Sequence, residues 1–90
     1  IADPGNLRIR LSIDGETLQD SNTNELIFGI PQLVEALSEV MTLEPGDVVS
    51  TGTPPGVGMA RSPQRYLRPG DVVSSSIEGV GTLTNPVVAE

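Results

Sequence analysis

An eight-residue segment occurs almost unchanged at two places in this chain, as LEPGDVVS at 43–50 and LRPGDVVS at 67–74. In both copies Pro-Gly occupies the centre of a tight turn, because proline presets φ and glycine supplies the positive φ that a type II turn needs. An aspartate and two valines follow, which is typical of the start of a strand. The flanking sequences do not match, which disfavours a solenoid repeat. We therefore expect two β-strands that are each entered through the same turn.

Turn-forming residues are common throughout the chain. The 90 residues include 10 Gly and 8 Pro, which favours short strands and turns over a helical bundle. A chain of this length makes at most one small domain and buries only about 60–65% of its unfolded surface. Since Phe28 and Tyr66 are the only aromatic residues, the core must consist mainly of Val, Ile and Leu. We expect a marginally stable domain.

The N-terminal part of the chain predicts a β-hairpin. Residues 7–13 alternate apolar and polar side chains, the pattern of a half-buried antiparallel strand. Asp14-Gly15 follows, and this pair is a strong signal for a two-residue hairpin turn. Residues 16–20 are then the returning strand.

One helix is predicted. After a loop, the chain becomes apolar at 26–28, where we expect a short buried segment. Residues 29–41 follow with apolar side chains at helical spacing, and Pro31 suits a first helical turn. The helix should end near Thr42.

The C-terminal part predicts a second hairpin. Residues 71–77 form one strand, Glu78-Gly79 the turn, and the return strand lies within 80–88. The sequence therefore predicts a mainly β fold with one helix, of the α+β class.

The charge of the chain excludes several partners. The formal net charge is −7, and all five basic residues are arginines that lie outside 11–60. This argues against binding to nucleic acid or to an anionic membrane, because both need a positive surface. An acidic surface serves solubility or a metal site, and we interpret it as a solubility feature. There is no Cys and no apolar run long enough to cross a bilayer, so we expect a soluble cytoplasmic protein without disulfides.

Most catalytic side chains are missing. His, Cys and Lys do not occur, so a catalytic group in this chain must be a carboxylate, a hydroxyl, an arginine or the backbone. The carboxylates show no clear spacing for a metal site. Asp14 and Glu16 flank a turn, and Glu35 and Glu39 lie on the exposed face of the predicted helix. We interpret both pairs as solvated charge.

The segment STGTPPGVG at 50–58 is the main candidate for ligand contact. Its glycines let the backbone approach a ligand closely, and its threonine hydroxyls can bind a carboxylate or a metal-bound oxygen. It lacks the Gly-Lys-Thr/Ser ending of a phosphate-binding loop, and Pro54 and Pro55 have no N–H donors. From these residues alone two interpretations stay open: a rigid surface loop, or a loop that contacts a ligand.

Several segments, in order, resemble the C-terminal part of the fumarylacetoacetate hydrolase family. They are DPGNL at 3–7, IDGETLQ at 13–19, LIFGIPQLVEALS at 26–38, TLEPGDVVSTGTPPGVG at 42–58, YLRPGDVV at 66–73 and IEGVGTL at 77–83. The resemblance implies a mixed β-roll and an enzyme that hydrolyses, cleaves, isomerises or decarboxylates 2-oxo or 2,4-dioxo acids. It also implies Mg²⁺ or Mn²⁺, held in the family by a Glu-x-Glu pair and a later Asp, commonly with a His–Glu pair and a Lys.

This metal and base machinery is absent from the sequence. No Glu-x-Glu occurs, so the resemblance places the metal ligands and catalytic residues outside this chain. Thr53 matches the family threonine that contacts the substrate carboxylate, and Gly52 gives backbone access beside it. Family members are often dimers, so a homodimer is a further expectation, although no residue identifies its interface. Asn24-Glu25 departs from the small residue and Met that many relatives carry there.

Three hypotheses follow. In the first, residues 1–90 are the C-terminal portion of a family catalytic domain, and the absence of an initiator Met agrees with this. In the second, they are a non-catalytic β module for assembly or ligand binding, which the missing His, Lys and Glu-x-Glu favour. A third, a small acidic adaptor unrelated to the family, leaves the ordered motifs unexplained.

Overall fold

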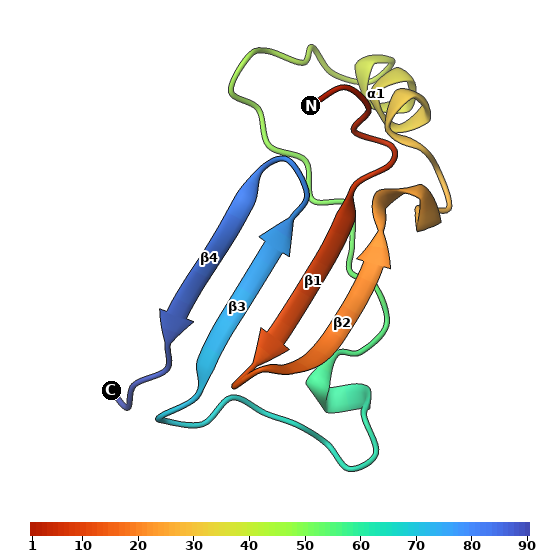
Figure 1. Cartoon of the computed structure of the whole chain (residues 1–90). Coiled ribbons are helices and arrows are strands. Elements are labelled where there is room, and N and C mark those ends of the chain that lie inside the picture. Colours follow the sequence, from red (N-terminus) through yellow and green to blue (C-terminus); the bar gives the residue numbers. More distant parts are fainter.

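The computed structural model describes residues 1–90 and contains one four-stranded antiparallel sheet (Figure 1). The strands are β1 (Arg8–Ile13), β2 (Glu16–Asn22), β3 (Val72–Ile77) and β4 (Gly81–Pro86), in the order β2-β1-β3-β4. The remaining elements are the helix α1 (Ile30–Ser38) and two 3₁₀ turns, η1 (Thr23–Glu25) and η2 (Gly58–Ala60). The predicted mainly β fold with one helix is confirmed.

Neither α1 nor the 3₁₀ turns are long and apolar enough to traverse a bilayer.

The first hairpin is confirmed, and its turn also holds the third strand. Asp14 and Gly15 have φ of 49° and 83°, the positive values that a two-residue hairpin turn requires. The Asp14 amide donates to the Val72 carbonyl at 2.9 Å, and the Val72 amide donates to Asp14 Oδ1 at 2.9 Å. Asp14 therefore joins the β1–β2 turn to the start of β3.

Strand β1 is half-buried, as its alternating sequence predicts. Ile9 and Leu11 are partly buried and Ile13 is buried, whereas Arg8 and Arg10 are exposed. Because β1 pairs with β2 on one side and β3 on the other, it is a central strand of the sheet.

The two PGD turns have the same geometry, but only the second leads into a strand. Asp47 Oδ2 accepts from the Glu44 amide at 2.8 Å, Asp71 Oδ2 accepts from the Arg68 amide at 2.8 Å, and the glycine of each turn has φ of 94°. After Asp71 the chain enters β3. After Asp47 no strand forms, and Val48 is 91% exposed. The prediction of a strand in the first copy is therefore wrong for this chain, because no neighbouring strand takes up its N–H and C=O groups.

Helix α1 lies within the predicted range 29–41 but is shorter. The amides of Val40 and Met41 both donate to the Leu37 carbonyl, at 3.1 and 3.0 Å. The convergence of two donors on one carbonyl is common at helix ends. The helix accordingly stops before Thr42.

The segment 26–28 is not a buried one. Leu26 is partly buried, but Ile27 and Phe28 are 92% and 61% exposed. The prediction of a buried segment is wrong for this chain because none of its strands covers these two side chains.

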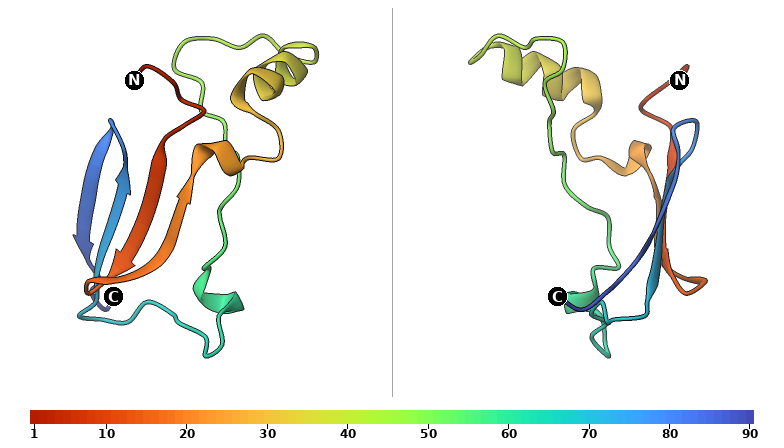
Figure 2. Two further views of the ribbon diagram at one scale, coloured as in Figure 1. Left: turned by 45° about the vertical axis from the view of Figure 1, so that its right-hand side comes forward. Right: turned by 90° about the vertical axis from the view of Figure 1, so that its left-hand side faces the viewer.

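Residues 1–90 do not enclose a hydrophobic core. Only Ile13, Leu18 and Asp71 are buried. The accessible surface is 6988 Å², against about 5,000 Å² for a folded monomer of this mass. The radius of gyration is 15.7 Å, against about 12 Å for a compact domain of this length. Figure 2 shows why: α1 lies beyond one end of the sheet, and only an irregular segment passes along one face.

Candidate functional site

The candidate loop, residues 50–58, packs against an irregularity in β2. The register of the β1–β2 pair shifts between Leu11 and Ser12, so that Leu18 is an extra residue on β2. Such a bulge leaves a backbone group unpaired and re-aims the neighbouring side chains. The Leu18 carbonyl accepts from Arg61 Nη1 at 3.1 Å, which ties the bulge to the chain that follows the loop.

Gly56 marks the closest approach between the loop and β2. A Cβ at this position would lie 2.0 Å from the Leu18 carbonyl oxygen and 3.0 Å from Gln19 Cγ, and Gly56 also has φ of 109°. Both the space and the backbone conformation therefore require glycine. The glycine at position 56 of the loop motif is explained by this packing.

Gln19, the residue after the bulge, holds the middle of the loop. Its Nε2 donates to Thr53 Oγ1 at 2.9 Å and to the Pro54 carbonyl at 2.8 Å. No other hydrogen bond to residues 48–56 occurs in this chain. The position of Thr53 relative to the sheet therefore depends on Gln19.

The backbone of the loop offers free donors. The amides of Thr51, Gly52 and Thr53 have no hydrogen-bond partner within the chain, and Pro54 and Pro55 carry no N–H. The donors available to a ligand thus include these three amides and the hydroxyls of Thr51 and Thr53. A compact anion such as a carboxylate fits this set of donors.

A hollow of about 440 Å³ lies beside these donors. Residues Thr51–Pro55 line it, and Ile9, Leu26, Phe28 and Leu33 contribute apolar surface. Glu25 also lines it, which places the residue that departs from the family pattern at the candidate site. Gly52 and Thr53, the residues expected to bind substrate, therefore both line this hollow.

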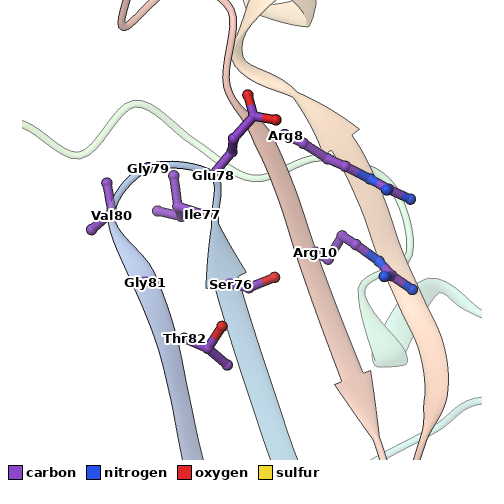
Figure 3. A pocket seen from close by; sticks show the side chains of 9 residues that line it. All are labelled: Arg8, Arg10, Ser76, Ile77, Glu78, Gly79, Val80, Gly81 and Thr82. Atoms are coloured by element: carbon purple, nitrogen blue, oxygen red, sulfur yellow. The ribbon is translucent and has the colours of Figure 1, made fainter.

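A second hollow lies near the β3–β4 turn and does not form an anion site. It measures about 540 Å³ and includes Arg8, Arg10 and Glu78. In Figure 3 both arginine side chains point away from the turn and over β2. Arg8 donates to both carboxylate oxygens of Asp20, at 3.0 and 2.8 Å, and this bonding lowers the pKa of the Asp20 carboxyl. The charge of Arg8 is therefore already paired, and Arg10 donates to Thr17 Oγ1 at 2.8 Å with its Nε 4.0 Å from the same Asp20 carboxylate.

The segment after the loop is anchored by Asp71. This buried carboxylate accepts from the Arg68 amide at 2.8 Å and from Arg65 Nη2 at 2.9 Å. The backbone bond from Arg68, followed by the bond and charge of Arg65, lowers the pKa of the Asp71 carboxyl. Asp71 is thus a structural anion, whereas its counterpart Asp47 is exposed.

The chain contains no group of three or more His, Cys, Asp or Glu that could hold a metal ion. The pairs Asp14/Glu16 and Glu35/Glu39 are exposed and form no such group. The residues present therefore do not fit a metal site.

Comparisons of sequence and of structure match this chain to one protein family. Residues 1–88 match the family model described as fumarylacetoacetate (FAA) hydrolase C-terminal. The chain belongs to the fumarylacetoacetate hydrolase family. It is 49% identical over 88 residues to the mitochondrial oxaloacetate tautomerase fahd2 of Xenopus laevis, an alignment that covers 98% of this chain and 28% of that protein.

Solved structures of the family share the fold. A fumarylacetoacetate hydrolase from psychrophilic Exiguobacterium antarcticum superimposes with a TM-score of 0.90 at 41% identity, covering 98% of this chain and 32% of that one. A maleylpyruvate hydrolase from Sphingobium sp. SYK-6, in complex with manganese(II) and pyruvate, gives a TM-score of 0.83 at 36% identity, covering 98% and 31%. Residues 1–90 thus span about a third of the length of these family members.

Sequence reasoning missed Gln19, Arg61 and the bulge at Leu18. No local pattern marks them, because their contacts join positions that are 34 to 43 residues apart along the chain.

Proposed function

We propose that residues 1–90 are the C-terminal portion of a divalent-metal-dependent enzyme that acts on 2-oxo or 2,4-dioxo acids. The observation that carries this is the match of residues 1–88 to a family whose similar members are named as a tautomerase and as hydrolases. The lack of an enclosed core supports the assignment, since further polypeptide would cover Ile27, Phe28 and Val48.

In this proposal Thr53 and Gly52 bind the carboxylate of the substrate. The three free amides of the loop and the Thr53 hydroxyl supply the hydrogen bonds, and apolar side chains line the same hollow. A metal ion, Mg²⁺ or Mn²⁺, would be held by residues outside this chain. The maleylpyruvate hydrolase structure, which contains manganese and pyruvate, supports that part of the proposal.

The reaction is one of hydrolysis, C–C cleavage, isomerisation or decarboxylation, and a homodimer is expected by likeness to the family. A cytoplasmic location is also a prediction, and the Xenopus relative is named as mitochondrial.

The second candidate function is a non-catalytic β module for assembly or ligand binding. The absence of a metal-binding cluster within residues 1–90 favours it.

One experiment distinguishes the metal-dependent enzyme from the non-catalytic module. The complete protein that contains residues 1–90 is purified, stripped of metal with a chelator, and assayed with oxaloacetate and with an acylpyruvate. The enzyme proposal expects turnover that returns on addition of Mg²⁺ or Mn²⁺. No turnover of either compound with either ion would favour the module.

A further inference from the structure

We propose that Gln19 is a positioning residue that aims the Thr53 hydroxyl at the carboxylate of the bound acid. The inference rests on the proposed role of Thr53 in substrate binding. Gln19 does not line the hollow, so it acts through Thr53.

The Pro54 carbonyl determines the orientation of the Gln19 amide. A carbonyl oxygen only accepts hydrogen bonds, so the atom of Gln19 at 2.8 Å from it must be the nitrogen. The same nitrogen lies 2.9 Å from Thr53 Oγ1. Since the amide carries two hydrogens, one is directed to each oxygen. Thr53 Oγ1 is therefore the acceptor in its bond with Gln19.

This assignment leaves the hydrogen of the Thr53 hydroxyl free to be donated. No acceptor for it occurs elsewhere in the chain, and Thr53 lines the hollow of about 440 Å³. A hydroxyl that accepts one hydrogen bond also becomes a better donor, because linked hydrogen bonds polarise one another. Gln19 thus prepares Thr53 to donate to an anion.

Gln19 also determines where that donor lies. Its two hydrogen bonds are the only ones that fix residues 48–56, and it directly follows the extra residue of the β2 bulge. A bulge re-aims the side chains next to it, and here the Gln19 side chain reaches Thr53 and Pro54 of the loop. Gln19 on β2 therefore positions the Thr53 hydroxyl, although residues 48–56 pair with no strand.

The test is the substitution Gln19→Glu in the complete protein, with pyruvate in the presence of Mn²⁺ as the probe. Glutamate has nearly the same shape, but both of its oxygens accept, so the Thr53 hydroxyl would turn to donate to it. We expect the dissociation constant of pyruvate to rise at least about tenfold, the equivalent of about 1.4 kcal/mol.

Gln64→Glu is the matched control. Gln64 Nε2 donates to the Met59 carbonyl at 3.0 Å, and Gln64 does not line the hollow. The charge change is the same, but Thr53 is not involved, so we expect less than about a twofold change in affinity. Equal weakening by both variants would mean a general charge effect and would overturn the proposal.

A double-mutant cycle with Thr53→Val shows whether Gln19 acts through Thr53. We expect Gln19→Glu to weaken pyruvate binding less than about twofold when Val occupies position 53. Additive losses would overturn the proposal. Gln19→Met, which keeps the length and removes the donors, repeats the cycle without a new charge, and thermal unfolding confirms that each variant is folded.

The outcomes also separate this inference from the proposed function. If Thr53→Val weakens binding but neither Gln19 variant does, only the role of Gln19 is wrong. If Thr53→Val binds pyruvate as tightly as the unsubstituted protein, or if that protein does not bind pyruvate, the proposed function is wrong and the inference is wrong with it.

Discussion

Gly56 lies so close to Leu18 that a Cβ on the glycine would be 2.0 Å from the Leu18 carbonyl oxygen. This contact lies beside the two hydrogen bonds that Gln19 makes to Thr53 and Pro54. The packing contact and these hydrogen bonds together hold the loop of residues 50–58 against the bulge of β2.

Substitution of Gly56 by Ala should destabilise the complete protein more than the same change at Gly46. Both glycines have positive φ, which costs alanine about 1–2 kcal/mol, but a Cβ at Gly46 meets no atom within 4 Å. At Gly56 the collision with β2 adds about 1–3 kcal/mol. Urea unfolding of the two variants measures the difference. Equal losses would show that the close approach does not exist in solution.

Residues 1–90 alone should not unfold cooperatively. Only three residues are buried, and the radius of gyration of 15.7 Å is larger than a compact domain of this length needs. We expect the separated chain to bind a hydrophobic dye and to show poor dispersion in a two-dimensional amide NMR spectrum. A single sharp unfolding transition with a well-dispersed spectrum would instead support an independent module.

The two PGD turns should differ in their sensitivity to loss of the aspartate charge. Asp71 is buried and bonded to Arg68 and Arg65, whereas Asp47 is exposed and bonded only to Glu44. We expect Asp71→Asn to lower the melting temperature at pH 7 more than Asp47→Asn does. Melting curves of both variants provide the comparison, and a larger loss from Asp47→Asn would contradict it.

The stabilisation by Asp71 should also depend on pH. The pKa of the Asp71 carboxyl is lowered in the folded state. Near this pKa the carboxyl therefore binds fewer protons in the folded protein than in the unfolded chain. The contribution is complete above the usual aspartate pKa of about 3.9 and is lost as the pH falls toward the lowered value. The difference in melting temperature between the unsubstituted protein and Asp71→Asn should therefore shrink as the pH falls below about 4. A difference that stays constant down to pH 2 would exclude a titrating role.

The Thr53 hydroxyl should be needed for affinity rather than for folding. Thr53 is exposed in this chain, so Thr53→Val should leave the melting temperature nearly unchanged. A hydrogen bond to a charged partner is worth about 1.5–3 kcal/mol, so we expect the KM for an oxo acid to rise about 10- to 100-fold. Thr53→Ser keeps the hydroxyl and should retain most of the affinity. Equal KM values for the Val and Ser variants would contradict the assignment.

The sequence predicts what depends on local conformation. The Asp14-Gly15 turn, the alternation of β1, the start of α1 and both PGD turns follow from preferences of neighbouring residues. The strand expected at Val48 does not form, because a strand needs a partner, and valine content does not say where a partner lies. In the same way, the apolar sequence at Ile27 and Phe28 does not show whether another segment covers these side chains, and both are exposed.

The candidate site was predicted only in part. The resemblance to the family implies a role for Thr53 and Gly52, whereas the loop residues alone leave a surface loop and a ligand-binding loop open; both residues line one hollow. Gln19 gave no signal, because a glutamine on an alternating strand is an ordinary solvent-facing residue. Its importance comes from the bulge at Leu18, and a one-residue change of register is not visible in the composition of a strand.

A crystal structure of the complete protein with Mn²⁺ and pyruvate would show directly whether Thr53 binds the substrate carboxylate. We expect the pyruvate carboxylate to lie about 3 Å from the Thr53 hydroxyl and from the loop amides, with Gln19 still bonded to Thr53. Pyruvate bound on the metal with its carboxylate held by other residues, and with Thr53 turned away, would contradict it.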